Sequence, residues 1–262
     1  MKIKETLIKA TEEAGKILKE NFGGEFKIES KDRESNLVTE VDKKSEEVIM
    51  KIIKSEFSDH YILTEESGDL STDSDYKWII DPIDGTINYA HSIPLCCVSI
   101  GVEHKGELIF GAVYNPMGNE FFYAGKGEGS FLNNKKIKVS QNNNFRKSLL
   151  VTGFPYNTSD NPRNPVGVFA EVVKQDIPVR RLGSAALDLC WVACGRFEGF
   201  WEFNLNAWDT AAGALIVTEA GGKLSSFEGG EYSVYDNEIL ASNGLIHNDL
   251  LEVIKKGKTS QV

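Results

Sequence analysis

The sequence predicts a layered protein of helices and β-sheets, α+β in its first half and α/β in its second. A long amphipathic helical pattern opens the chain, and a run of strands joined by short turns follows it. After residues 142–144, short apolar strands alternate with helical segments, which is the pattern of an α/β unit. The chain has 262 residues, 41% of them hydrophobic. We therefore expect one domain over 1–262 with two packed lobes, about 1–143 and about 144–262.

Two helices are expected before the first strand. Apolar residues recur at helical spacing between Ile3 and Leu18, and the pattern stops at Gly23. A second apolar face runs from Val41 to Ile53. Both faces predict helices that lie on a sheet.

The strands of the first half follow in order, separated by turn residues. The strand at 77–81 is an apolar run that we expect Pro82 to end, because proline cannot donate to a β-ladder. The later strands are close enough in sequence to form an antiparallel meander. The expected strands are Tyr61–Thr64, Lys77–Asp81, Cys97–Glu103, Glu107–Asn115, Asn119–Gly125 and Lys136–Ser140.

The second half is expected to alternate between buried strands and helices. The strands are expected at Leu149–Thr152, Val179–Arg181, Gly199–Phe203 and Ile239–Ala241. The helices are expected at Val166–Lys174, Ser184–Ala193, Asp209–Ala220 and Ile246–Lys256.

Composition excludes several classes of protein. The formal net charge of -10 argues against broad binding to nucleic acid or anionic membranes. No apolar run approaches the roughly 18 residues of a membrane span, and the amino terminus does not have the pattern of a signal peptide. Four cysteines are too few for a disulfide framework, so we expect them to be reduced and mostly buried in a cytoplasmic protein.

Carboxylates gather where the expected elements begin or end. They are Asp42, Glu65, Glu66, Asp81, Asp84 and Asp209. Each acid alone has a structural explanation, because an acid in the first turn of a helix complements the helix dipole and paired acids suit a solvated turn. Two strands that both terminate in acids nevertheless suggest that these side chains converge. Convergent carboxylates without a histidine or cysteine cluster favour Mg²⁺ first and Mn²⁺ second.

An anion site is expected beside these acids. Gly85 and Thr86 follow Asp84 directly, and their backbone NH groups would suit a phosphate. Two or more hard cations would clamp a phosphate and activate a water molecule as its nucleophile. The sequence therefore predicts a metal-dependent phosphatase.

Three separated segments resemble the inositol monophosphatase family, and the likeness covers essentially the whole chain. They are Leu63–Ser67, Trp78–Tyr89 and Trp208–Gly213, with Thr218–Gly222 completing the last signature. The residue before the glutamate pair is Thr64, where the family often has glycine. The resemblance implies an αβαβα sandwich and a Mg²⁺-dependent, lithium-sensitive phosphatase that is commonly a homodimer.

The resemblance also implies residue roles. The first metal would be held by Glu65, Asp81 and the Ile83 carbonyl, the second by Asp81, Asp84 and Asp209, and a weaker third would lean on Glu65. Thr86, supported by Asp42, would orient the attacking water. Substrate contacts would come from Ile83, Asp84, Gly85, Thr86, Gly183, Ser184, Ala185, Glu202 and Asp209. Lys31 matches a family lysine near the mouth of the site.

Several alternatives stay open at this point. The same chemistry on fructose 1,6-bisphosphate, histidinol phosphate or a 3′-phosphorylated nucleotide competes with hydrolysis of inositol monophosphate. Arg180 and Arg181 suit either a second phosphate or a dimer partner. A regulatory binding protein that keeps the fold is the alternative from another class. Loss of metal ligands would mark such a protein, and none is lost here.

Overall fold

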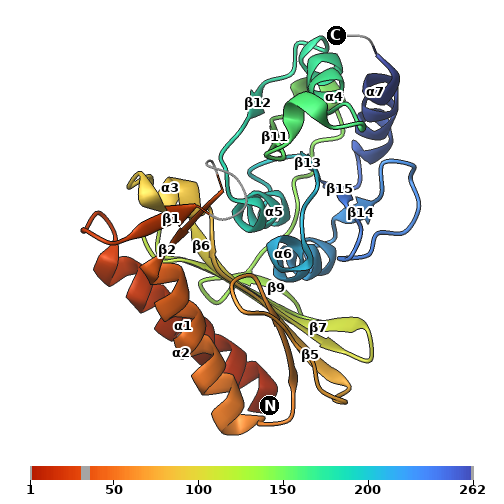
Figure 1. Cartoon of the computed structure of the whole chain (residues 1–262). Helices are drawn as coiled ribbons and strands as arrows, with labels where there is room; N and C mark the ends of the chain where they lie inside the picture. Colours follow the sequence, from red (N-terminus) through yellow and green to blue (C-terminus); the bar gives the residue numbers. More distant parts are fainter. Residues whose placement is uncertain (1, 31–35, 261–262) are drawn as a thin grey trace.

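The computed structural model describes residues 2–30 and 36–260, which form five layers of helices and sheets (Figure 1). The paired helices α1 and α2 cover one face of a large sheet, and α5 and α6 lie between that sheet and a smaller one. Helices α4 and α7 cover the far face of the smaller sheet. This αβαβα order confirms the predicted fold class.

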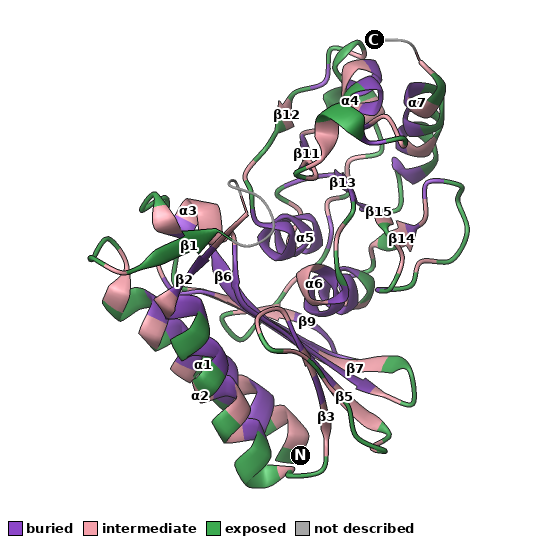
Figure 2. Ribbon diagram, in the orientation of Figure 1, coloured by how far each residue is buried: buried purple, intermediate pink, exposed green. Residues whose placement is uncertain are grey.

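The helices agree with the periodicity of the sequence. They are α1 (Lys2–Asn21), α2 (Glu40–Glu56), α3 (Thr86–Ala90), α4 (Pro165–Val173), α5 (Ala185–Ala193), α6 (Ala207–Glu219) and α7 (His247–Thr259), with 3₁₀ turns at Phe145–Lys147 and Thr158–Asp160. Among residues 2–30 and 36–260, none of these helices combines the length and apolarity needed to cross a bilayer. The two sandwiched helices are the most buried in Figure 2, as expected for elements covered by sheets on both sides.

The large sheet has eight strands in the order β10-β9-β8-β7-β6-β5-β3-β4. The expected meander is present, since β5 to β10 pair antiparallel with their successors. The strands are β3 (Tyr61–Thr64), β4 (Gly68–Leu70), β5 (Tyr76–Asp84), β6 (Cys97–His104), β7 (Glu107–Asn115), β8 (Glu120–Gly125), β9 (Gly129–Leu132) and β10 (Lys135–Lys136). A separate two-stranded sheet joins β1 (Ile28–Ser30) to β2 (Leu37–Thr39).

The expected end of the strand at Pro82 is wrong. Strand β5 continues to Asp84, and its pairing with β6 shifts register between Asp81 and Asp84. The irregularity leaves Pro82 without a required ladder bond, so the missing NH is tolerated. It also brings two acids onto one short segment of strand.

The expected strand at Lys136–Ser140 is also largely wrong. Only Lys135 and Lys136 pair, with β9. The NH of Val139 donates instead to the carbonyl of Ala220 at 3.2 Å. After the NH of Ile137, which still donates to the carbonyl of Ser130 at 2.9 Å, the chain therefore bonds to the end of α6 and no longer to the sheet.

The smaller sheet has the order β12-β11-β13-β15-β14. Its strands are β11 (Leu150–Thr152), β12 (Val179–Arg180), β13 (Gly199–Phe203), β14 (Lys223–Ser225) and β15 (Glu238–Ser242). Strands β12, β11 and β13 run parallel to one another, and β15 pairs antiparallel with both β13 and β14. All the strands expected in this half are present, and β14 is additional.

Two paired glycines let α6 approach the large sheet closely. Gly101 of β6 lies opposite Gly111 of β7. A Cβ at Gly101 would lie 2.7 Å from the Cβ of Ala211, and one at Gly111 would lie 2.9 Å from the carbonyl oxygen of Ala212. The helix backbone therefore rests on the sheet, which fixes the position of the first turn of α6.

This contact makes Gly111→Ala costly. The added methyl group would meet helix backbone rather than a flexible side chain, so we expect unfolding to require about 1–3 kcal/mol less than in the wild type. Urea denaturation measures the difference. Gly230→Ala is the matched control, because the Cβ there would lie 3.6 Å from its nearest neighbour, Ser226 Oγ. An equal loss in both variants would contradict this account.

Candidate active site

Three aspartates from two elements converge at one point. Asp81 and Asp84 come from the end of β5, and Asp209 comes from the first turn of α6. One carboxylate oxygen from each lies within 4.8 Å of the others. Glu65, directly after β3, lies close enough to Asp81 for its side chain to raise the pKa of Asp81. The predicted convergence of acids is therefore present in the structure.

Burial and repulsion raise the pKa values of these acids. Asp81 is 1% exposed, and burial raises its pKa well above the usual range, with further contributions from Glu65, Asp84 and Asp209. Burial and the neighbouring acids raise the pKa of Asp209 in the same way. A divalent cation would relieve this repulsion, and the oxygen-only donor set suits Mg²⁺. The residues present therefore fit a hard metal ion.

The turn before α5 holds Asp84. The Oδ2 atom of Asp84 accepts hydrogen bonds from Ser184 Oγ at 2.6 Å and from the NH of Ala186 at 2.7 Å. Burial raises the pKa of Asp84 to about 6, while these bonds oppose the shift. The serine therefore fixes one oxygen of Asp84 and leaves the other available to the cluster.

A second interaction ties α2 to the start of α3. Thr86 Oγ1 lies 3.1 Å from Asp42 Oδ1 and 2.9 Å from the carbonyl oxygen of Ile83. The other oxygen of Asp42 accepts bonds from the backbone and side chain of Thr39, which caps α2. Burial raises the pKa of Asp42 to about 6. Asp42 can therefore accept a proton near neutral pH.

Gly85, between Asp84 and α3, has a conformation and a packing that only glycine suits. Its φ is +90°, in the left-handed region. A Cβ there would lie 2.9 Å from the carbonyl oxygen of Leu95 and 3.1 Å from that of Gly183. The turn that carries Asp84 and Thr86 is thus held between two other loops.

Glu202 lies in β13, across the cavity from β5. It is 8% exposed, and burial together with Asp209 and Asp84 raises its pKa, while Arg181 opposes the shift. Gly153 makes room for it, since a Cβ on that glycine would lie 2.1 Å from Glu202 Oε1. Gly153 was not predicted as part of the site, although its place directly after a strand was a signal.

These groups line a cavity of about 610 Å³. The predicted residues that line it are Glu65, Asp81, Ile83, Asp84, Gly85, Thr86, Gly183, Ser184, Ala185, Glu202 and Asp209. Asp42 acts from behind this lining through Thr86, and Lys31 falls outside the described residues. The cavity wall also contains Arg181, whose guanidinium carbon lies 5.5 Å from the centre of the Phe154 ring. Arg181 therefore faces the cavity, as contact with a second phosphate would require. A dimer contact was the other alternative for this residue.

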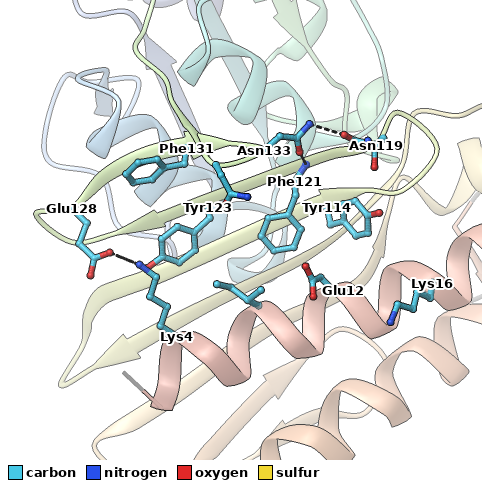
Figure 3. Close-up of a pocket in the computed structure, with 12 residues that line it drawn as sticks. Lys4, Glu12, Lys16, Tyr114, Asn119, Phe121, Tyr123, Glu128, Phe131 and Asn133 are labelled. Atoms are coloured by element: carbon cyan, nitrogen blue, oxygen red, sulfur yellow. Dashed lines mark hydrogen bonds and ion pairs between the residues drawn. The ribbon is translucent and has the colours of Figure 1, made fainter.

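A second hollow, of about 650 Å³, lies between α1 and strands β7 to β9 (Figure 3). Aromatic side chains, among them Phe121 and Tyr123, face α1 there. Lys4 closes one end through a 2.7 Å ion pair with Glu128. Among the described residues that line this hollow, there is no acid cluster like that of Asp81, so we place the chemistry in the acidic cavity.

Removing one acid should stabilise the metal-free protein. The pKa of Asp81 is raised on folding, so its contribution to stability is present below its unfolded pKa and is lost as pH rises through the folded pKa. Asparagine does not titrate. We expect Asp81→Asn in a chelator to melt higher than the wild type at about pH 8, by roughly 2–4 °C for each kcal/mol of repulsion removed. The gain should shrink toward about pH 5.

Calorimetry at several pH values measures this difference. The control is Asp73→Asn, at an exposed position outside the cluster, which should leave the melting temperature unchanged. A lower melting temperature for Asp81→Asn at every pH would show that repulsion does not dominate at this position.

Comparison with known proteins agrees with this geometry. The profile of the inositol monophosphatase family matches residues 2–259. An inositol-1-monophosphatase of Synechocystis is 44% identical over 89% of this chain and 82% of its own. The Nus factor SuhB of Escherichia coli K12 is 40% identical over 90% of this chain and 89% of its own. The solved inositol monophosphatase from Anabaena superposes with a TM-score of 0.87 at 39% identity, covering 96% of this chain and 94% of that one. The chain thus belongs to the inositol monophosphatase family and is a phosphatase.

Proposed function

We propose that this phosphatase uses Mg²⁺ to hydrolyse a small phosphorylated polyol, with inositol monophosphate as the first candidate. The observation that carries the proposal is the convergence of Asp81, Asp84 and Asp209 in a cavity beside the Thr86–Asp42 pair. The family is metal-dependent and acts on small phosphorylated substrates, which supports the same conclusion.

The oxygen donors suggest how the ions would be shared. Glu65, Asp81 and the Ile83 carbonyl would hold the first ion, and Asp81, Asp84 and Asp209 the second, with a weaker third beside Glu65. Bound Mg²⁺, or Mn²⁺ in its place, would supply charge neutralisation and an acidified water. Asp81 is central to this assignment, because it would serve both ions.

Thr86 and Asp42 would orient the nucleophile. Asp42 accepts the hydroxyl proton of Thr86, so the lone pairs of Oγ1 can accept a hydrogen bond from the attacking water. Deprotonation of that water is helped by a carboxylate whose pKa lies near 6. This arrangement needs no covalent phosphoenzyme.

The substrate would lie in the acidic cavity, against the turn that carries Gly85 and Thr86. The NH groups of Gly85 and Thr86 would bind phosphate oxygens. The polyol hydroxyls would be met by Asp84 and Asp209, by the turn Gly183, Ser184 and Ala185, and by Glu202. We propose that both lobes, about 1–143 and about 144–262, act as one catalytic domain. A homodimer and a cytoplasmic location remain predictions.

A second candidate substrate carries another anionic group. Arg181 faces the cavity beside Phe154 and lies near enough to Glu202 to lower its pKa. That placement favours fructose 1,6-bisphosphate or a 3′-phosphorylated nucleotide over histidinol phosphate, which carries a cationic amine and no second anionic group. A purely regulatory role is the non-enzymatic candidate, and the name Nus factor belongs to a relative. The complete acid cluster favours catalysis over that role.

The test is phosphate release across these substrates. With Mg²⁺ we expect turnover of inositol 1-phosphate that lithium inhibits. Asp81→Asn should lose about 100-fold or more in kcat/KM and remain folded, because one side chain would serve two ions. Asp73→Asn should match the wild type. Full activity in Asp81→Asn would overturn the metal assignment, and no turnover of any substrate would favour the regulatory role.

The two neighbouring arginines separate the candidate substrates. If a second phosphate contacts Arg181, Arg181→Ala should raise KM for fructose 1,6-bisphosphate by about tenfold or more. Turnover of inositol 1-phosphate should change less than about twofold. Arg180→Ala is the matched control, since Arg180 is absent from the cavity wall. Steady-state kinetics of both variants with both substrates measures these changes. Equal KM and kcat values for Arg181→Ala and Arg180→Ala would contradict the assignment.

A further inference from the structure

The first half of α2 carries three buried polar residues on one face. Asp42, Ser45 and Glu46 are 0%, 0% and 3% exposed. Ser45 and Glu46 follow Asp42 by three and four residues, about one helical turn, which places both beside Asp42 on the side that faces the candidate site. Asp42 and Ser45 contact the segment from β5 to α3, and Glu46 contacts the turn after β3.

Asp42 and Ser45 each make one hydrogen bond toward the candidate site. Asp42 meets Thr86 at the start of α3, as described above. Ser45 Oγ donates to the carbonyl oxygen of Pro82 at 2.9 Å, within the bulged end of β5. These two residues link α2 to the segment that carries Asp81 and Asp84.

Glu46 makes the most extensive contact of the three. Its Oε2 accepts from Thr64 Oγ1 at 2.5 Å, from the NH of Glu66 at 3.1 Å and from the NH of Ser67 at 3.3 Å. Its Oε1 accepts from Ser67 Oγ. The four donors come from residues immediately before and after Glu65, so one carboxylate fixes the chain on both sides of Glu65.

The electrostatics explain why this carboxylate is tolerated inside the protein. A buried charge is costly unless it is paired or hydrogen-bonded. Within the described part of the chain Glu46 has no ion pair, and its compensation comes from these neutral donors. Thr64 supplies a hydroxyl that a glycine at this position could not.

The peptide of Glu65 is held from the sheet side as well. Its NH donates to the carbonyl oxygen of Ile80 at 3.2 Å. The backbone of Glu65 is therefore fixed by β5 and by α2 together. Its side chain reaches Asp81 from a turn that is already ordered.

We propose that Glu46 is a positioning residue that orders the turn carrying Glu65 and so sets the metal affinity of the site. The inference rests on the proposed function only for the role of Glu65 as a ligand. Partners that orient metal ligands typically change metal affinity by about 10- to 100-fold when removed. The ordering itself needs no metal, so it can be measured in the metal-free protein.

The experiment compares three variants of the full chain with the wild type. Glu46→Ala removes the carboxylate, and Glu46→Gln keeps its shape and an acceptor oxygen. Glu47→Ala is the matched control, because Glu47 is the next residue on α2 and is exposed. Amide hydrogen exchange at Glu66 and Ser67 is measured without metal. Binding of Mn²⁺ is measured by electron paramagnetic resonance.

We expect Glu46→Ala to speed exchange at both amides and to weaken Mn²⁺ binding about 10- to 100-fold. Glu46→Gln should recover most of both losses, and Glu47→Ala should match the wild type. If Glu46→Ala does not fold, Thr64→Val serves instead, since it removes one donor to Glu46 without changing side-chain shape. It should weaken Mn²⁺ binding roughly threefold.

Unchanged exchange and unchanged Mn²⁺ affinity in folded Glu46→Ala, or in Thr64→Val, would overturn the inference. A lower melting temperature with unchanged Mn²⁺ affinity would also overturn it, because Glu46 would then be structural only. If the wild type itself bound no Mn²⁺, the proposed function would fail. The exchange comparison would still decide whether Glu46 orders the turn.

Discussion

Mutual repulsion among carboxylates that the fold forces together is the constraint on which the rest of this structure depends. Asp81, Asp84 and Asp209 approach within 4.8 Å, and burial raises the pKa of each. Each aspartate accepts a hydrogen bond from a neutral donor. The NH of Ile83 donates to Asp81, Ser184 Oγ donates to Asp84, and the NH of Asn206 donates to Asp209. These donors orient the acids without cancelling their charge. The cluster therefore keeps its negative field toward the cavity, where a cation would balance it.

The layered fold stabilises this costly arrangement by supporting it from several directions. The acids come from β5 and α6, and α6 is fixed by its close approach to Gly101 and Gly111 in the large sheet. On the opposite face of that sheet, α2 bonds the ends of β3 and β5 through side chains. The site thus lies at an edge of the large sheet. Helix–sheet packing outside the site sets the distances between its acids.

Local pattern was sufficient to predict the helices other than α3, most strands and the convergence of acids, because each depends on periodicity or on residues close in sequence. The continuation of β5 past Pro82 was not predictable, since it depends on a bulge against β6. The departure of the chain at Val139 depends on a carbonyl at the end of α6. Glu46 was missed although it lies one turn after Asp42, because a buried acid on an otherwise apolar helix face shows its role only once its donors are placed.

Two further buried acids, Asp188 of α5 and Glu202 of β13, are held differently from the three clustered aspartates. Neither oxygen of Asp188 has a hydrogen-bond partner among the residues that the structure describes, and burial raises its pKa well above the usual range. The pKa of Glu202 is raised mainly by burial and further by the charges of Asp209 and Asp84. A cation bound among the aspartates would weaken the contribution of Asp209 and Asp84 to this pKa and leave the contribution of burial unchanged. In the proposed function, a bound cation would therefore favour the ionised form of Glu202, whose two oxygens would then accept hydrogen bonds from substrate hydroxyls.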